Sequence, residues 1–371
     1  MKRRHFLATT VIAGTTPFAP TFASASNKTA DSRVAIIGHT DRGNYGHGLD
    51  TVWQRIPQTE IVGVADADAG GLAAELKKLG IDRGFSDYRV MLQETRPEFV
   101  SVAPRHADQH FDMIMACIDA NVKGLYVEKP FCRTPAEADQ IIAAAERQGC
   151  RIAVAHRNRY HPVLPVIRKM VADGAIGRLH ELRGRGKGDR RGGGEDLWVL
   201  GCHIFNLFEY FGGSPRSCSA LMLQDGRHVT AADVHPGNEG LGPLAANEVR
   251  ARYELADGVI GYFDSIASDQ TANSFSVQLI GSKGIIVIHI DRDPLAHLLP
   301  GEPMAITSEP RQWIPITSAG PGQPEPDPQT IAGVHNHEVA VRDLVDAVNN
   351  GHEPVCDAHA GATAVEMICA V

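Results

Sequence analysis

Short apolar segments alternate with amphipathic, helix-forming segments from residue 33 to residue 155, and this alternation constrains the fold more than any other feature of the chain. We predict strands at Arg33–Gly38, Ile61–Asp66, Gly84–Ser86, Phe99–Ala103, 122–127 and Ile152–Ala155. We predict helices at Leu49–Ile56, Leu72–Leu79 and His110–Ala120, and a further helix from its N-cap Thr134 to Gly149. Regular strand–helix alternation of this length forms a parallel, doubly wound sheet. The predicted fold class is therefore α/β, with a dinucleotide-binding domain over residues 26–155.

A glycine turn follows the first predicted strand, and an acid ends the second. Gly38 and Gly43 bound the turn, and Asp66 closes the next strand. In dinucleotide folds such a turn cradles the pyrophosphate at a helix N-terminus, and the acid accepts hydrogen bonds from the adenosine ribose. Asp66 disfavours a 2′-phosphate and so favours NAD, whereas the nearby Arg42 keeps NADP as an alternative. Thr40 stands where the motif has its second glycine, so the motif is degenerate.

Glu128-Lys129-Pro130 follows directly after the fifth predicted strand. The carboxyl edge of a parallel sheet is where ligands bind in such folds. A lysine that is partly desolvated at this edge can move protons. The alternative is a salt-bridged strand end without a chemical role.

The pattern changes after His156, and we predict a substrate-binding α+β domain over residues 156–371. Strands are predicted at Glu248–Leu255, Gly258–Ser265, Ser274–Ile280 and Gly284–His289, and a helix at His337–Asn349. Clustered antiparallel strands of this kind indicate a large, open, mostly antiparallel sheet, whose exposed face can pack against a partner subunit.

A glycine-rich loop with two acids, Glu195 and Asp196, enters an amphipathic helix that carries His203. A histidine with a carboxylate nearby is a plausible acid–base pair, and the alternative is a helix histidine packed under a loop. The preceding segment 183–191 is strongly basic, and either is a solvated loop or steers an anionic group into a cleft.

The cysteines and histidines do not indicate a metal site. The seven cysteines form no CxxC pair, so a disulfide framework or structural zinc is not expected. His156, His161 and the group His335-Asn336-His337 lack the i, i+4 spacing of helical ligands and have no cysteine partner in the sequence. We therefore predict that the chain binds no metal.

The N-terminus has the features of an export signal. Lys2-Arg3-Arg4-His5-Phe6-Leu7 is a twin-arginine motif, and Ala23-Ser24-Ala25 is a cleavage site, so we predict a signal peptide over residues 1–25. The alternatives are an ordinary secretory signal or a disordered tail. The twin-arginine translocase carries folded proteins, which predicts a periplasmic protein that leaves the cytoplasm with a tightly bound cofactor. The apolar run 8–22 is too short and too interrupted by proline to span a membrane.

Net charge excludes some partners. The whole chain carries −8, and removal of the three basic residues of the signal lowers this to −11. A domain this acidic is a poor candidate for binding nucleic acid or an anionic membrane surface.

With these motifs the chain resembles the Gfo/Idh/MocA family of oxidoreductases, which includes glucose–fructose oxidoreductase and inositol dehydrogenase. The resemblance rests on the strand ending at Gly38, on Pro104 after the fourth strand, on Glu128-Lys129-Pro130, on the loop leading to His203, and on the turn 279–284. It implies a Rossmann domain followed by an open-sheet domain, in a homodimer or homotetramer, and a sugar or cyclitol as substrate.

The resemblance also assigns residues. It implies that Lys129 and His203 manage the hydroxyl proton while a hydride leaves a ring carbon. It implies that the nicotinamide cofactor lies across the turn that begins at Gly38, and contacts the residues Thr40, Arg42, Gly43, Asp66, Pro104, Arg105, Glu128 and Lys129.

Several positions depart from the family pattern. Val199 and Asn206 stand where many members have aspartates, and Arg105 stands where an asparagine is usual. Asp196 can replace a missing carboxylate only if its loop folds back, and we predict it as a third catalytic residue. Members usually continue beyond the apolar helix that ends at Val371, so a truncated sequence is one interpretation of this end.

Three functions remain open. The first is an NAD(P)-dependent oxidoreductase of a carbohydrate or cyclitol. The second is an NAD-dependent glycosidase that oxidises its sugar transiently with a trapped cofactor. The third is a non-catalytic sugar-binding protein, suggested by the missing carboxylates.

Overall fold

Six parallel strands form the sheet of the N-terminal half, in the order β3-β2-β1-β4-β5-β6. The computed structural model describes residues 32–268 and 275–371, so the predicted signal at 1–25 lies outside the described residues. The strands are β1 (Ser32–Ile37), β2 (Thr59–Ala65), β3 (Gly84–Phe85), β4 (Phe99–Val102), β5 (Gly124–Val127) and β6 (Arg151–Val154). The strand order reverses between β1 and β4, and ligands bind at this point in doubly wound sheets. The predicted α/β class is confirmed.

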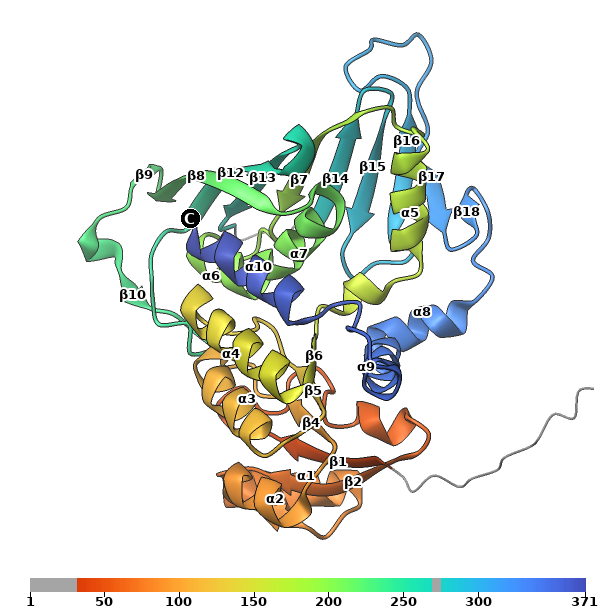
Figure 1. Cartoon of the computed structure of the whole chain (residues 1–371). Coiled ribbons are helices and arrows are strands. Elements are labelled where there is room, and N and C mark those ends of the chain that lie inside the picture. The colour runs from red at the N-terminus through yellow and green to blue at the C-terminus, as the bar shows by residue number, and fades with distance from the viewer. Residues whose placement is uncertain (1–31, 269–274) are drawn as a thin grey trace, which may run out of the picture. The chain divides into compact units, whose positions relative to one another are not determined.

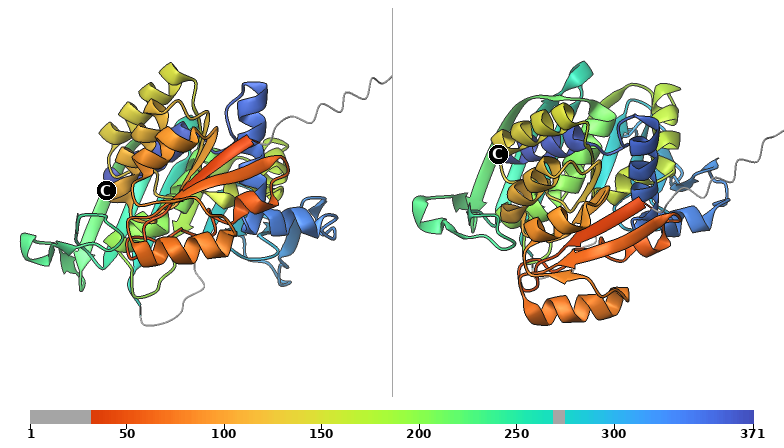
Figure 2. Two further views of the ribbon diagram at one scale, coloured as in Figure 1. Left: turned by 90° about the horizontal axis from the view of Figure 1, so that it is seen from below. Right: turned by 60° about the horizontal axis from the view of Figure 1, so that its bottom comes forward.

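Helices cover both faces of this sheet (Figures 1 and 2). They are α1 (Ala69–Leu79), α2 (Tyr88–Thr95), α3 (His110–Asp119) and α4 (Pro135–Gln148), and the sequence analysis missed α2. The predicted boundaries of α4 are confirmed, because the Thr134 hydroxyl accepts a hydrogen bond from the Glu137 amide and Gly149 ends the helix at a φ of 67°. Helix α9 (Glu338–Asn350), from the far end of the chain, packs against β5 and β6.

The predicted helix at Leu49–Ile56 is wrong, because only the 3-10 turn η1 (Val52–Arg55) forms there. Gly43 and Gly46 upstream have φ of 94° and 60°, and the chain winds through turns as far as residue 51. Trp53 is nevertheless 1% exposed, and its indole N–H donates to the Ser101 hydroxyl at 2.7 Å. The apolar residues in this segment therefore recur because they are buried, and their spacing does not indicate an α-helix.

A ten-stranded sheet dominates the second half, in the order β18-β17-β16-β15-β14-β7-β13-β12-β8-β9. Its strands are β7 (Leu179–Arg185), β8 (Pro215–Gln224), β9 (Arg227–His228), β12 (Glu248–Leu255), β13 (Ile260–Ile266), β14 (Ser276–Gly281), β15 (Gly284–His289), β16 (Ala296–Pro300), β17 (Ile314–Thr317) and β18 (Gly320–Pro321). Neighbours are antiparallel except for β7 with β13. The predicted mostly antiparallel sheet is confirmed, while the predicted strand start at Ser274 lies outside the described residues.

The remaining elements pack against this sheet or connect the halves. They are α5 (Val163–Ala172), α6 (Gly194–Val199), α7 (Gly201–Gly212), α8 (Pro328–His335), α10 (Ala358–Cys369), the pair β10 (His235–Pro236) and β11 (Pro243–Leu244), and the 3-10 turns η2 (Ala107–Gln109), η3 (Arg157–Tyr160), η4 (Ala231–Asp233) and η5 (Ala256–Gly258). Helix α7 packs on β7 and β13, and α10 packs on both α7 and α4. Helices α9 and α10 thus tie the C-terminal segment to the parallel sheet, and the domain boundary at residue 155 stays a prediction.

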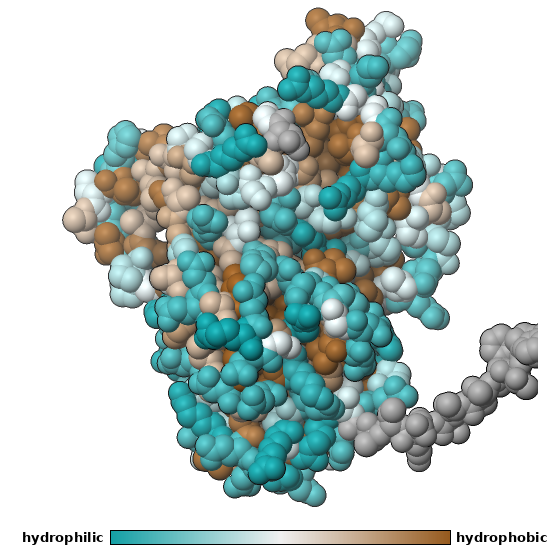
Figure 3. Space-filling view, viewed as in Figure 1, coloured by the Kyte–Doolittle hydropathy of each residue, from teal (hydrophilic) through white to brown (hydrophobic). Residues whose placement is uncertain are grey.

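Exposed hydrophobic side chains are concentrated in the loop between β16 and β17. Met304 and Ile306 are 89% and 102% exposed, and Trp313 is 46% exposed. Figure 3 shows hydrophobic side chains at the tip above these strands, whereas hydrophilic side chains cover much of the visible surface around α1 to α4. Among the described residues, none of the helices has both the length and the apolar character that a membrane crossing requires.

Candidate active site

Glu128 and Lys129 follow the last residue of β5 and are almost fully buried, with exposed fractions of 1% and 5%. The Glu128 carboxylate accepts hydrogen bonds from the Lys129 amide at 2.9 Å and lies 3.0 Å from the His47 Nδ1. Burial alone raises the pKa of the Glu128 carboxyl, but the bond to His47 and the charge of Lys129 outweigh burial and bring this pKa to about 2. Glu128 is therefore a fixed negative charge at the strand end.

Lys129 connects this strand end to the second half of the protein. Its Nζ donates a hydrogen bond to the carbonyl oxygen of Val199, the last residue of α6, at 3.2 Å. Val199 is one of the positions where relatives in the predicted family carry an aspartate, and here its backbone, not its side chain, contacts the lysine. The ammonium group is therefore held where the two halves meet.

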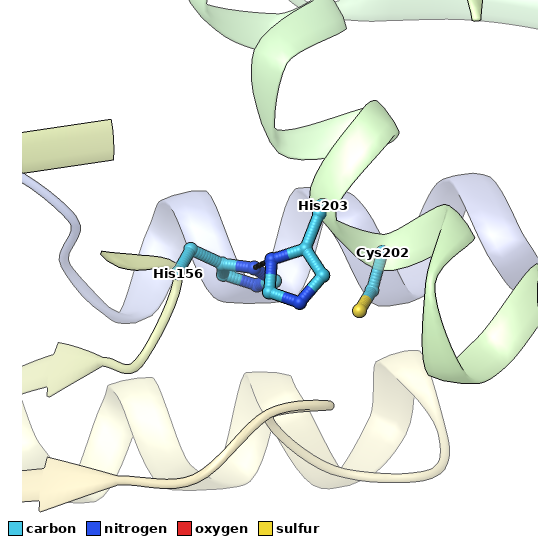
Figure 4. A group of neighbouring side chains, drawn as sticks. All are labelled: His156, Cys202 and His203. Atoms are coloured by element: carbon cyan, nitrogen blue, oxygen red, sulfur yellow. Dashed lines mark hydrogen bonds between the residues drawn. The ribbon is translucent and has the colours of Figure 1, made fainter. Parts of the chain in front are cut away.

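His203 and His156 form a pair, with Cys202 on the neighbouring position of α7 (Figure 4). Their Nδ1 atoms are 3.3 Å apart, and the rings meet edge to face. Burial, and then the charge of Lys129, lowers the pKa of His156 to about 3. Burial and the neighbouring His156 and Lys129 also bring the pKa of His203 well below its usual value, although this ring keeps some contact with the cavity. Both imidazoles are therefore neutral near pH 7.

Cys202 completes a group of three possible metal ligands, because its Sγ and one nitrogen of each histidine lie within 4.8 Å of one another. Linear spacing does not reveal this group, since His156 and His203 are 47 residues apart. Burial raises the pKa of the Cys202 thiol to about 12, and the thiol donates to Val199 O at 3.5 Å. Lys129 binds the same oxygen, and its positive charge opposes a metal cation there. The absence of a metal stays a prediction.

A cavity of about 230 Å³ brings these groups together. The predicted residues Arg105, Glu128, Lys129 and His203 all line it. It is also lined by His47, Ala155, Arg157, Lys187, Arg191, Val199, Leu200, Glu239, Asp291 and His337. Sequence analysis missed most of these residues as site residues. Three of them do stand in segments that the sequence marks, Lys187 and Arg191 in the basic segment 183–191 and His337 in the histidine group 335–337.

Asp196 does not line this cavity. It is fully buried, and its Oδ2 accepts a hydrogen bond from the Ser265 hydroxyl of β13 at 2.5 Å. Burial raises the pKa of its carboxyl, an effect that the bond from Ser265 reduces. Asp196 lies in α6 rather than in a loop, and its carboxylate joins this helix to β13 of the antiparallel sheet instead of entering the cavity beside Lys129.

A second cavity, of about 490 Å³, opens at the carboxyl ends of β1 and β2. Gly38, Arg42 and Asp66 line it, as expected for the adenosine half of a dinucleotide. Arg42 is ion-paired with Asp108, another lining residue, at 2.5 Å. The size of this second cavity and the carboxylate of Asp66 fit a nucleotide. The smaller cavity beside Lys129 fits a nicotinamide ring and a substrate.

Asp66 is already saturated by hydrogen bonds from the protein. Its carboxylate accepts from the Thr40 hydroxyl at 2.7 Å, the Thr40 amide at 3.1 Å, the Tyr45 hydroxyl at 2.8 Å and the Asp68 amide at 2.9 Å. Thr40 is therefore turned toward Asp66 and lines neither cavity. The Tyr45 ring covers Gly38, where an added Cβ would lie 2.0 Å from the ring. A ribose hydroxyl that binds Asp66 must displace one of these donors, and the Tyr45 hydroxyl is one of the two side-chain donors to its Oδ2.

The other predicted cofactor residues, Gly43 and Pro104, also lie outside both cavities. A Cβ on Gly43 would lie 2.3 Å from the Arg105 amide nitrogen, so this glycine allows the turn to approach the end of β4. The Pro104 carbonyl oxygen lies 2.7 Å from the His110 ring. Their contacts are therefore internal to the protein.

Comparison with known proteins finds two family matches and several similar dehydrogenases, of which the chain covers only part of the first ones' length. Residues 32–156 match the family described as "Oxidoreductase family, NAD-binding Rossmann fold", and residues 166–287 match the "GFO/IDH/MocA C-terminal domain". D-apiose dehydrogenase of Paraburkholderia graminis is 34% identical over 125 residues, which are 34% of this chain and 33% of that protein. Levoglucosan dehydrogenase of Pseudarthrobacter phenanthrenivorans is 23% identical over 263 residues, 64% of this chain and 66% of that protein.

Solved structures agree in fold. A levoglucosan dehydrogenase in complex with NADH and L-sorbose has a TM-score of 0.72 at 18% identity, over 92% of this chain and 96% of that one. The aligned length shows that both sheets and their connection are shared with that structure.

Proposed function

This chain belongs to the Gfo/Idh/MocA family of oxidoreductases, and from this premise we propose that it is an NAD-dependent dehydrogenase of a sugar, cyclitol or sugar derivative. The observation that carries the proposal is the meeting of Lys129 and His203 in one cavity, next to a nucleotide-sized cavity at the switch point of the parallel sheet. The matched relatives are dehydrogenases of D-apiose and levoglucosan, which supports a carbohydrate substrate.

Two protein groups would manage the hydroxyl proton of the substrate. A bound nicotinamide supplies the hydride acceptor. The positive charge of Lys129, which is 5% exposed, stabilises the substrate oxygen as it loses its proton. His203, which is neutral, offers an unprotonated nitrogen to that proton, and His156 at 3.3 Å can carry it further. The pair of histidines thus stands in for the aspartates that are absent at Val199 and Asn206.

We propose NAD as the cofactor, with Asp66 toward the adenosine ribose and Gly38 under the pyrophosphate. A carboxylate at the end of β2 repels a 2′-phosphate. Arg42, which would be the group to bind such a phosphate, is already paired with Asp108. Arg105, Glu128 and Lys129 are then placed toward the nicotinamide.

We further propose that the protein is exported to the periplasm with its cofactor bound, and that it forms a homo-oligomer. Export is supported by the twin-arginine motif at Arg3-Arg4 and the cleavage site at Ala23–Ala25. Oligomer formation is supported by the exposed Met304, Ile306 and Trp313 of the loop between β16 and β17, because large apolar side chains exposed in one segment are typical of contact surfaces.

A non-catalytic sugar-binding protein is the second candidate, and the saturation of Asp66 favours it. If the Tyr45 hydroxyl cannot be displaced, the nucleotide cavity stays closed to a ribose. The two candidates differ in whether the protein binds NADH.

The test is a titration of the full-length protein with NADH and, separately, with NADPH, followed by nucleotide fluorescence. A parallel sample that has seen no added nucleotide is denatured, and the released nucleotides are identified by mass spectrometry. We expect NADH to bind at least about tenfold more tightly than NADPH, a difference of ~1.4 kcal/mol. Stoichiometric release of NAD(H) would support a trapped cofactor. Failure of both nucleotides to bind would favour the sugar-binding protein.

A further inference from the structure

His337 reaches the candidate active site from the far end of the chain. It lines the cavity that holds Glu128 and Lys129, and is 2% exposed. Its Nδ1 lies 2.5 Å from the hydroxyl of Tyr126, a β5 residue 211 positions earlier in the sequence. The packing of α9 on β5 brings the two residues together. None of the roles assigned above uses His337.

The backbone at His337 is in an unusual conformation. Its φ is 68° and its ψ is 0°, in the left-handed region that non-glycine residues rarely occupy. His337 is the N-cap of α9, and a single residue separates it from α8, which ends at His335. Strain of this kind persists only where surrounding contacts hold the residue in place, and it is found often at ligand-binding positions. Here the turn directs the ring toward the parallel sheet.

The hydrogen bond from Tyr126 determines where the imidazole proton lies. Tyr126 is fully buried, and burial keeps the pKa of its hydroxyl well above the usual value, so the hydroxyl keeps its proton. Among the described residues its one hydrogen-bond partner is His337 Nδ1, so we assign the Tyr126 hydroxyl as the donor and this nitrogen as the unprotonated acceptor. Burial lowers the pKa of His337 to about 4, so the ring is neutral and carries its single proton on Nε2.

That Nε2–H group has no hydrogen-bond partner among the described residues, although it is buried. A buried donor without an acceptor is costly, and native proteins rarely leave one. His337 also lines the cavity, so an acceptor atom of a molecule bound there is a partner that the Nε2–H group can take.

We propose that His337 is a substrate-binding residue, and that its Nε2–H donates a hydrogen bond to a hydroxyl oxygen of the sugar or cyclitol. The proposal rests on the function proposed above. Tyr126 is the positioning residue, because it fixes the orientation of the ring and the nitrogen that carries the proton. A nicotinamide carboxamide oxygen would offer the same chemistry, and the experiment separates the two sources.

The experiment compares H337F, H337Q and the control H335F in the full-length protein. His335 is two residues away, 30% exposed in its side chain and ion-paired with Asp293, and it does not line this cavity. NADH binding is titrated first, and then levoglucosan, L-sorbose and myo-inositol are titrated into the NADH complex by calorimetry. Loss of one buried hydrogen bond predicts about tenfold weaker sugar binding in H337F. We expect unchanged NADH binding, partial rescue by H337Q and no effect of H335F.

Two results would overturn the assignment. One is sugar binding by H337F within twofold of the wild-type protein. The other is a loss of NADH affinity in H337F, which would make the cofactor the acceptor. If the wild-type protein binds no NADH, the proposed dehydrogenase function itself is wrong, and the assignment of His337 falls with it.

A spectroscopic measurement tests the proton assignment without any ligand. Protein with ¹⁵N-labelled histidine is examined by NMR, and the signals absent in H337F are assigned to His337. We expect a protonated Nε2 and an unprotonated Nδ1 near pH 7. In Y126F, which retains the ring but removes its hydrogen-bond donor, we expect the tautomers to mix. A protonated Nδ1 in the wild-type protein would overturn the proposal even if none of the three sugars binds.

Discussion

The Nζ of Lys129 lies 3.2 Å from the carbonyl oxygen of Val199 and donates a hydrogen bond to it. This bond joins the carboxyl end of β5 to the end of α6, and so connects the parallel sheet to the helices of the antiparallel half. His203 lies on α7, two residues after this helix begins, and lines the same cavity as Lys129. The lysine is thereby held at the point where both halves contribute to the candidate active site.

Removal of the Tyr45 hydroxyl should tighten NADH binding. That hydroxyl donates to Asp66 at 2.8 Å, and the ribose must compete with it. One neutral hydrogen bond to a charged acceptor corresponds to ~1.5 kcal/mol, or about tenfold in affinity. NADH titration of Y45F against the wild-type protein measures this. Weaker binding in Y45F would mean that the hydroxyl assists the cofactor. Y88F, at a tyrosine that lines the nucleotide-sized cavity and does not bind Asp66, is the control.

Stability should fall as the pH drops below 6.5. His156 and His337 have folded-state pKa values of about 3 and 4, below the usual 6.5, so the unfolded chain binds more protons in this range. Each imidazole then costs about 1.4 kcal/mol of stability per pH unit between 6.5 and its folded-state pKa. Glu128, with its pKa of about 2, adds a further loss below pH 4.5.

Urea unfolding at pH 7, 6 and 5 measures this dependence. The variant H156F should show a shallower loss, because one of the imidazoles whose pKa is lowered by burial is gone. Unfolding free energies that do not change between pH 7 and pH 5 would show that neither imidazole is held neutral by burial.

Substitution of Asp196 by asparagine should change stability more than catalysis. Its carboxylate contacts the Ser265 hydroxyl at 2.5 Å and is absent from the cavity. We expect D196N to unfold ~1–3 kcal/mol more easily, because a buried charged acceptor is lost, with kcat within about twofold. The neighbouring E195Q is the control. A fall in kcat of about 100-fold with unchanged stability would support the proton-relay role that the sequence suggested.

Chelation should leave activity unchanged. His156, Cys202 and His203 are arranged as possible ligands, but the charge of Lys129 beside them opposes a cation. Protein dialysed against a chelator should keep its turnover, and metal analysis should find less than one ion in ten chains. A different result would establish a metal-dependent enzyme instead: chelation stops turnover, added zinc restores it, and C202A shows no turnover.

Local signals predicted the first half of the fold well. Thr134 and Gly149 bound α4 as expected, because caps act through hydrogen bonds to their own helix. The predicted helix at Leu49–Ile56 failed because the apolar spacing marks buried residues, while upstream glycines in the left-handed region direct the chain into turns.

The candidate site was only partly predictable. Lys129 and His203 stand in motifs that are visible in the sequence. His337 and Asp291 reach the cavity through the packing of distant segments, which has no local signature. The hydrogen bonds from Thr40 and Tyr45 that saturate Asp66 join side chains far apart in the sequence, so the spacing of residues along the chain does not predict them.

The most direct test of the central claim is the absorbance at 340 nm after levoglucosan, L-sorbose, D-apiose and myo-inositol are added, one by one, to the NAD⁺-loaded wild-type protein and to K129M. We predict a rise with at least one of these compounds in the wild-type protein. We predict no rise in K129M, which should still bind NADH. Turnover by K129M at the wild-type rate would contradict the role of Lys129. A wild-type protein that binds NAD⁺ but reduces it with none of the four compounds would contradict the proposed dehydrogenase.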